Sequence, residues 1–318
     1  MREGKTLLPE KNSIEQKLSV TISGVTLKVP VIPASGTFGF GHEMAKFYDL
    51  NILGAIALKG TTKDERYGNE LPRIAECSSG LLNAIGLQNP GVNRVITNEL
   101  PKLKECYNGP VIANISGFSI EEYSEIAAAF DATDVSIIEV NISCPNAKEA
   151  GMAFGINENS AAAVTKAVRK VTSKPVYIKL SPNVTDIVSI AKACEDEGAD
   201  GLTLINTLLG MRIDPYSGKP IVSTGMAGFS GPAIKPVAVR MVYQVYEAVK
   251  IPIMGVGGIS SADDVIEMIS AGASAVQIGS ANLINPYACR DIICELKEKF
   301  NGYRLLSIDQ CTGRSHNE

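Results

Sequence analysis

A cysteine stands between two asparagines in the segment Asn141-Ile142-Ser143-Cys144-Pro145-Asn146. A short run rich in β-branched residues, at 135–140, precedes this segment and is followed by Pro145, so we expect an interior strand that opens into a loop here. In parallel α/β folds, ligands bind outside the carboxyl ends of the strands. The alternative is a cysteine that fills space in the core, as free cysteines often do. Two flanking amides would then need buried partners, so the pattern favours a reactive thiol at a ligand site.

Glycine-rich segments follow the last two predicted strands, at residues 254–259 and 277–281. Glycine lets backbone N–H groups approach phosphate oxygens closely, and the phosphate site of a barrel commonly lies in these two loops. The alternative is that the glycines only make tight turns. We expect a phosphate cradle here, closed from the side by Gly231 and formed by Gly257, Gly258, Gly279 and Ser280.

Two lysines, Lys59 and Lys179, each end a predicted strand. An ammonium in a barrel mouth needs an anionic partner, which is either ligand charge or a structural salt bridge. Carboxamides also recur at strand ends or in a long loop. Any one of them is more often a turn residue, but together they suit a planar, imide-like ligand or an isoalloxazine edge. These amides are Asn83, Asn114, Asn141, Asn146 and Asn206.

Eight short apolar segments alternate with helical patterns, and this order predicts a (β/α)8 TIM barrel. Residues 18–28 alternate about a glycine turn and predict an N-terminal β-hairpin that closes the bottom of the barrel. Ser119 and Ser261 each stand three residues before an acid, which is typical of a helix start. Three long connections, at residues 60–90, 144–160 and 207–236, are expected to roof the pocket. The predicted strands lie at residues 29–34, 55–58, 111–114, 136–141, 176–180, 201–206, 252–255 and 275–279.

The composition excludes several classes of protein. The 318 residues are 45% hydrophobic and 20% charged, which fits a soluble protein with a barrel-sized core. No apolar run approaches the roughly 18 residues of a membrane span, and residues 1–16 do not form a signal peptide, so we expect a cytoplasmic protein. Seven cysteines without a CxxC pair, and two histidines, predict neither disulfides nor a metal site. A net charge of −4 without a basic stripe argues against nucleic acid as a partner.

Taken together, the motifs resemble the class 1 dihydroorotate dehydrogenases, specifically the catalytic subunit of the NAD-linked 1B type. The resemblance implies FMN and the oxidation of (S)-dihydroorotate to orotate in de novo pyrimidine (UMP) biosynthesis. It also implies a single FMN-binding barrel domain at residues 18–318, preceded by an extension at residues 1–17 without an assigned role. The similar segments are residues 33–39, 57–62, 82–91, 141–146, 205–207, 230–236 and 257–259.

The resemblance assigns roles to individual residues. Cys144 matches the catalytic base, which would remove a proton from one face of the substrate while a hydride leaves for flavin N5 on the other. Lys59 would pair with the substrate carboxylate, and Lys179 would stabilise the reduced flavin. The expected FMN-binding residues are Ser35, Lys59, Gly60, Asn114, Asn141, Lys179, Ile205, Gly231, Gly257, Gly258, Gly279 and Ser280. The expected substrate-binding residues are Lys59, Asn83, Ala84, Ile85, Gly86, Leu87, Asn141, Asn146, Asn206 and Thr207.

Electrons must leave the reduced flavin, yet the sequence has no second dinucleotide-binding pattern and no clustered cysteines. A separate redox subunit is therefore expected. The resemblance implies a partner with FAD and a [2Fe–2S] cluster that passes electrons to NAD, around a homodimer core within a heterotetramer. Four alternatives stay open: a fumarate-linked 1A-type homodimer, a dihydropyrimidine-reducing flavoenzyme, a Schiff-base lyase that uses Lys179, and a non-catalytic barrel that binds a phosphorylated ligand.

Overall fold

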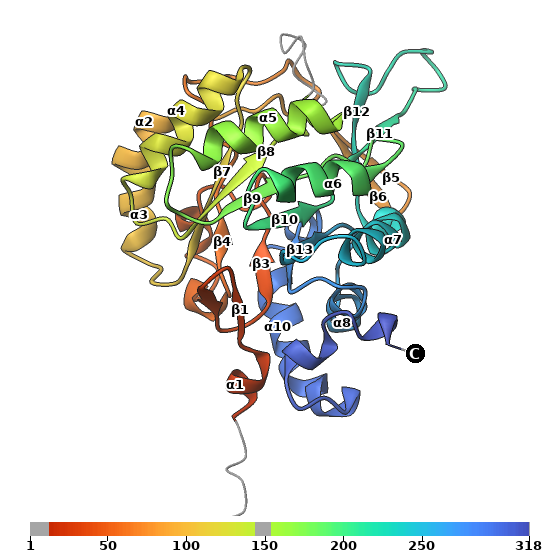
Figure 1. Cartoon of the computed structure of the whole chain (residues 1–318). Coiled ribbons are helices and arrows are strands. Elements are labelled where there is room, and N and C mark those ends of the chain that lie inside the picture. The colour runs from red at the N-terminus through yellow and green to blue at the C-terminus, as the bar shows by residue number, and fades with distance from the viewer. Residues whose placement is uncertain (1–12, 144–153, 318) are drawn as a thin grey trace, which may run out of the picture.

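The computed structural model describes residues 13–143 and 154–317. Eight parallel strands form a sheet that curls into a nearly closed barrel, in the order β3-β14-β13-β10-β9-β8-β7-β4 (Figure 1). The barrel closes between its first two strands, where Gly54 N donates to Val31 O at 3.0 Å. Every predicted strand is present, with ends that differ by at most two residues from the prediction, so the (β/α)8 prediction is confirmed. The strands are β3 (Val31–Pro33), β4 (Ile56–Ala57), β7 (Val111–Ile115), β8 (Ile137–Asn141), β9 (Val176–Lys179), β10 (Gly201–Leu204), β13 (Ile253–Val256) and β14 (Ala275–Ile278).

Helices surround the barrel (Figure 1). The predicted helix starts are confirmed, because the Ser119 side chain accepts from Glu122 N and the Ser261 side chain accepts from Asp264 N. The α-helices are α1 (Ile14–Leu18), α2 (Val92–Arg94), α3 (Leu100–Lys104), α4 (Ile120–Asp131), α5 (Glu158–Arg169), α6 (Ile187–Asp196), α7 (Lys235–Tyr246), α8 (Ala262–Ser270), α9 (Ala281–Ile284) and α10 (Ala288–Lys299). Short 3-10 or π turns are η1 (His42–Met44), η2 (Leu50–Ile52), η3 (Val95–Glu99), η4 (Pro232–Ile234), η5 (Phe300–Tyr303), η6 (Ile308–Cys311) and η7 (Arg314–His316).

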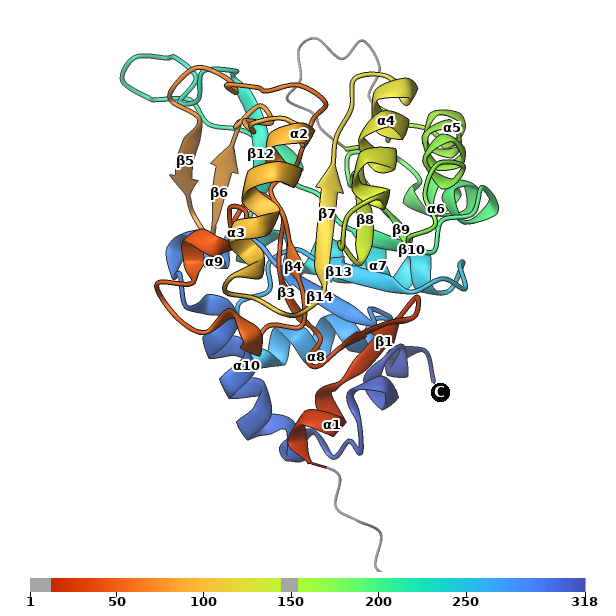
Figure 2. The same ribbon diagram turned by 90° about the vertical axis from the view of Figure 1, so that its left-hand side faces the viewer.

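The predicted N-terminal hairpin is confirmed as β1 (Val20–Ile22) paired with β2 (Val25–Leu27). In its turn, Ser23 Oγ donates to Asp200 O at 2.7 Å and lies 2.9 Å from Tyr177 Oη. Asp200 directly precedes β10, and Tyr177 is fully buried near the start of β9. The hairpin therefore lies at the amino ends of the strands, below the barrel in Figure 2. The hairpin thus covers this end of the barrel.

A four-stranded antiparallel sheet stands above the barrel, where the sequence predicted only long loops. Two of those connections pair with each other, because Leu82 on β6 lies opposite Phe229 on β12. The face of this sheet opposite to Asn83 buries a small apolar cluster that includes Leu82, Ala84 and Ala227. Each hairpin alone would be marginally stable, and the pairing joins segments far apart in sequence, so local patterns did not reveal it. Its strands are β5 (Ile74–Cys77), β6 (Gly80–Asn83), β11 (Leu208–Met211) and β12 (Met226–Ser230), all labelled in Figure 1. Their order in the sheet is β11-β12-β6-β5.

Two features are absent from the described part of the chain. Among residues 13–143 and 154–317, no helix has the length and apolar character that a membrane crossing requires. The same residues contain no group of three or more His, Cys, Asp or Glu side chains placed to hold a metal ion.

Candidate active site

A cavity of about 230 Å³ opens at the carboxyl ends of the barrel strands, beneath the upper sheet. All twelve of the residues predicted to hold FMN line it, from Ser35 after β3 to Ser280 after β14. Of the predicted substrate residues, those that line it are Lys59, Asn83, Ile85, Gly86, Leu87, Asn141, Asn206 and Thr207. Cys144 and Asn146 lie outside the described residues. The fold thus brings into one cavity residues that are spread over most of the chain.

Ala84 is the exception among the predicted residues that the structure describes. Its side chain is buried in the apolar cluster of the upper sheet and does not line the cavity. Its backbone is engaged too, because Ala84 N donates to Arg73 O at 2.7 Å and Ala84 O accepts from Asn69 Nδ2 at 2.9 Å. Side chains alternate along an extended segment, so Asn83 and Ile85 face the cavity while Ala84 faces away. A contact between Ala84 and a ligand is therefore not supported.

The glycine turns divide into two kinds. Gly257 and Gly258 adopt φ values of +134° and +72°, and a Cβ on Gly258 would lie 2.6 Å from the Lys235 Cβ. The turn itself therefore requires these two glycines, as the alternative interpretation of the sequence held. Gly279 differs, because its φ is not positive and a Cβ there would meet nothing within 4 Å. Since Gly279 lines the cavity, it is glycine without any local need for it, and a close-lying ligand would explain that choice.

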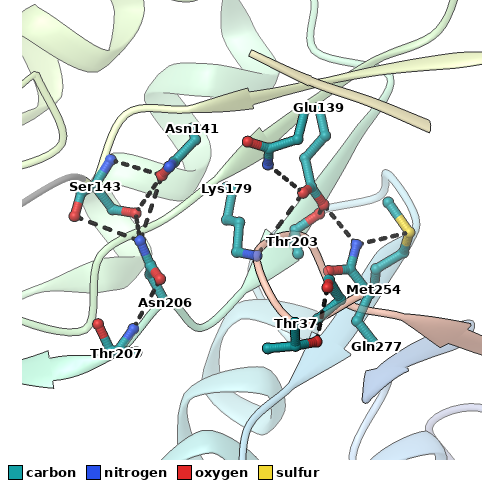
Figure 3. A network of polar contacts seen from close by, with 12 residues as sticks. Thr37, Glu139, Asn141, Ser143, Lys179, Thr203, Asn206, Thr207, Met254 and Gln277 are labelled. Atoms are coloured by element: carbon teal, nitrogen blue, oxygen red, sulfur yellow. Dashed lines mark hydrogen bonds and ion pairs between the residues drawn. The ribbon is translucent and has the colours of Figure 1, made fainter. Parts of the chain in front are cut away.

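The amides at the ends of β8 and β10 are tied together (Figure 3). Asn141 Oδ1 accepts from Ser143 Oγ at 2.8 Å, and Asn206 Nδ2 donates to the same Ser143 hydroxyl. Thr207 N donates to Asn206 Oδ1 at 3.0 Å, while Tyr123 Oη donates to Asn141 O at 2.8 Å. Sequence reasoning missed the role of Ser143, although this residue stands inside the segment 141–146 that contains Cys144. These bonds orient the amides that line the cavity and anchor the chain immediately before Cys144.

One further group below the cavity, the Glu139 carboxylate, was missed by sequence reasoning. Glu139 on β8 is fully buried, and its Oε1 lies 3.8 Å from Lys179 Nζ. Lys179 is therefore both a cavity-lining residue and a salt-bridge partner, so the two interpretations of this lysine are compatible. Asn114 donates through Nδ2 to Glu139 at 2.7 Å. Its Oδ1 is buried and has no hydrogen-bond partner among the residues that the structure describes. Such an acceptor at a cavity wall is a natural place for a ligand donor.

The described cysteines are not candidates for a base in this cavity. None of the six, Cys77, Cys106, Cys194, Cys289, Cys294 and Cys311, is among the residues that line it. Burial raises the pKa of Cys194 to about 12 and also raises the pKa of Cys289 strongly. A thiol of this kind is neither ionised nor reactive near neutral pH.

The fold and the cavity define an α/β barrel protein with a polar, cationic ligand site at the carboxyl ends of its strands. The family model for dihydroorotate dehydrogenase matches residues 17–300. A protein named "Dihydroorotate dehydrogenase B (NAD(+)), catalytic subunit" from Anoxybacillus flavithermus is 57% identical over 302 residues, which cover 95% of this chain and 96% of the relative. The protein of that name from Malacoplasma penetrans is 56% identical over 301 residues, covering 94% and 98% of the two chains. The chain therefore belongs to the dihydroorotate dehydrogenase family, and the resemblance of its motifs to that family is confirmed.

Proposed function

We propose that this protein oxidises (S)-dihydroorotate to orotate in de novo pyrimidine biosynthesis, as the FMN-containing catalytic subunit of an NAD-linked dihydroorotate dehydrogenase. The observation that carries the proposal is the convergence of glycine turns, two lysines and oriented amides on one cavity, in a chain of this family. The same proposal includes a single FMN-binding domain at residues 18–318, a cytoplasmic location and the site roles given above.

The chemistry of the cavity fits FMN. A flavin mononucleotide needs a place for its phosphate, and Gly279 and Ser280 offer one where no side chain fills the space. Its ring system carries an imide N–H, which suits the buried acceptor Asn114 Oδ1. Apolar side chains of Ile205 and Val256 supply walls for a flat ring. When bound, FMN would supply the hydride acceptor.

The protein's own residues would bind and deprotonate the substrate. The Lys59 side chain would pair with the carboxylate, while Asn83 and Asn206 would offer uncharged donors and acceptors to the ring. Cys144, which follows Ser143 directly, is the proposed base that removes the ring proton. The arrangement would bind a flat, singly charged ring and remove a proton from one of its faces.

One anaerobic experiment tests the proposal. The purified protein should be yellow, and dihydroorotate added without oxygen should bleach the flavin. Dihydrouracil, which lacks the carboxylate, should bleach it far more slowly. A colourless protein that borohydride traps with a carbonyl substrate would contradict the proposal in favour of a Schiff-base lyase. A flavin that dihydroorotate leaves oxidised would contradict it as well.

Replacing Lys59 by methionine should lower kcat/KM for dihydroorotate by about 10–100-fold, because a charged hydrogen bond contributes about 1.5–3 kcal/mol. Dihydrouracil has no carboxylate, so its slow rate should change much less. Steady-state kinetics with both substrates, on samples of known FMN content, measure the difference. The control is Lys63→Met, which removes an exposed lysine that pairs with Glu125 on the surface. Equal losses with both substrates would contradict the carboxylate role of Lys59.

The relatives are named catalytic subunits, which implies a separate partner subunit. We propose that the partner carries FAD and a [2Fe–2S] cluster, passes electrons to NAD, and assembles around a homodimer of this chain in a heterotetramer. The isolated chain should then reduce an artificial dye but neither NAD nor fumarate. Adding the partner subunit should restore NAD reduction. Direct and rapid fumarate reduction by the isolated chain would favour the 1A-type alternative instead.

A further inference from the structure

We infer that Glu139, a buried residue outside the proposed binding set, is a positioning residue for the flavin site, because its carboxylate orients the Asn114 amide and holds the Lys179 ammonium. The inference rests on the proposed function, since it concerns the same cavity. Glu139 does not line that cavity, so any effect on a ligand must pass through its neighbours.

The Glu139 carboxylate lies inside the barrel, where it accepts hydrogen bonds from three other strands and forms an ion pair with a fourth (Figure 3). Oε1 accepts from Asn114 Nδ2 on β7 at 2.7 Å and lies 3.8 Å from Lys179 Nζ on β9. Oε2 accepts from Thr203 Oγ1 on β10 at 2.8 Å and from Gln277 Nε2 on β14 at 2.6 Å. Burying a charged carboxylate is costly unless donors surround it. These partners meet that need and fix the carboxylate in one place.

The fixed carboxylate determines which end of the Asn114 amide is left for a ligand. An amide has one donor group and one acceptor group. Because Nδ2 donates to Glu139, the remaining group is Oδ1, which is buried without a partner among the described residues. A Cβ on Gly60 would lie 2.9 Å from this oxygen, and Gly60 lines the cavity as Asn114 does. By holding the Asn114 amide in this orientation, Glu139 leaves the acceptor Asn114 Oδ1, and not the donor Nδ2, at the cavity wall.

The same carboxylate also holds the Lys179 side chain. This lysine is only 5% exposed, and its ammonium forms an ion pair with Glu139 Oε1. The attraction between the two groups keeps the ammonium beside the carboxylate. The separation of 3.8 Å is longer than a hydrogen bond, so the ammonium hydrogens remain available to other groups. Lys179 is therefore held in one position at the cavity wall.

The competing explanation is that Glu139 only joins strands in the core. Thr203→Val separates the two explanations, because Thr203 is fully buried, bonds the other carboxylate oxygen and does not line the cavity. A purely structural network predicts that both Glu139→Gln and Thr203→Val lower the melting temperature and leave FMN affinity alone. A positioning role predicts a loss of FMN affinity in Glu139→Gln only.

The experiment is a fluorescence titration of each apoprotein with FMN. We expect the Kd of Glu139→Gln to rise at least tenfold and that of Thr203→Val to change less than twofold. Glu139→Asp keeps the charge but withdraws it from Asn114 and Lys179, so it should lose affinity by a similar factor; it replaces the Gln variant if that variant does not fold. Wild-type FMN affinity in the Glu139 variants would overturn this inference but not the proposed function. An equal loss of FMN affinity in Thr203→Val would do the same. A wild-type protein that binds no FMN would overturn the proposed function, and this inference with it.

A second readout isolates the contribution of Lys179. The two-electron midpoint potential of the bound flavin is measured in Glu139→Gln, Lys179→Met and the double variant. If the carboxylate acts through Lys179, the shifts are not additive and the double variant matches Lys179→Met. We expect each single variant to change the ratio of oxidised to reduced FMN affinity by at least tenfold, which is about 30 mV for a two-electron couple. Additive shifts, or an unchanged potential in Glu139→Gln, would overturn the role through Lys179.

Discussion

Replacing Cys144 by alanine should lower the rate of flavin reduction by dihydroorotate by about 10²–10⁴-fold, the usual contribution of a positioned base. FMN and orotate should still bind, because the proposed contacts to both come mostly from other residues. Anaerobic stopped-flow absorbance measures the rate, and orotate titration of the oxidised enzyme measures binding. No other thiol can substitute, since none of the described cysteines lines the cavity.

Two further variants sharpen this test. Cys144→Ser places a hydroxyl that stays protonated near neutral pH, so its rate should be low there and rise with pH. Cys294→Ala removes an exposed thiol on α10 and should reduce the flavin at the wild-type rate. If Cys144→Ala reduced the flavin within threefold of wild type, Cys144 would not be the base. If Cys144→Ala lost orotate binding as well as the rate of flavin reduction, Cys144 would instead have a role in binding the substrate.

Replacing Gly279 by alanine should weaken FMN binding by about 10–100-fold while leaving the apoprotein folded. The new Cβ meets no protein atom within 4 Å, and the backbone does not require glycine. A Gly→Ala change at a compatible position typically stabilises a protein by about 0.4–1 kcal/mol, so the apoprotein should melt at or slightly above the wild-type temperature. The methyl group would occupy space that a phosphate needs, and one lost charged hydrogen bond accounts for a 10–100-fold loss of affinity.

Gly302→Ala is the matched control for this variant. A Cβ at Gly302 also meets nothing within 4 Å, and Gly302 does not line the cavity. It should bind FMN as the wild type does. The readout is the rise in melting temperature on adding FMN, which should persist in Gly302→Ala and shrink in Gly279→Ala. If Gly279→Ala bound FMN with unchanged affinity, the FMN phosphate would not bind at this loop.

Local patterns in the sequence were sufficient to predict the barrel. The strands of a parallel sheet are buried on both faces, so each reads as a short apolar run, as at residues 136–141. Ser119 and Ser261 mark helix starts because a capping hydroxyl acts within three residues of its own position. The carboxyl ends of parallel strands lie at one end of a barrel, so the sequence alone was enough to group residues that end different strands as one site.

The upper sheet could not be predicted in the same way. Leu82 and Phe229 pair although their segments lie far apart in the chain. Nothing in the local sequence of either hairpin, β5–β6 or β11–β12, indicates that the two pair with each other. The same pairing decides that Asn83 lines the cavity while Ala84 does not. A motif assigns a function to a stretch of residues, but side-chain alternation in the folded sheet decides which of them face a ligand.

The sequence by itself determined the fold class, the family and nearly all of the residues that line the cavity, because these depend on short-range patterns and on motifs that keep their order along the chain. Only the tertiary structure decided what supports them. Glu139 sits in an ordinary apolar run. Its importance comes from partners on four other strands: hydrogen bonds from Asn114, Thr203 and Gln277, and an ion pair with Lys179. The closed barrel brings these side chains to one buried carboxylate, and no spacing along the chain encodes that meeting.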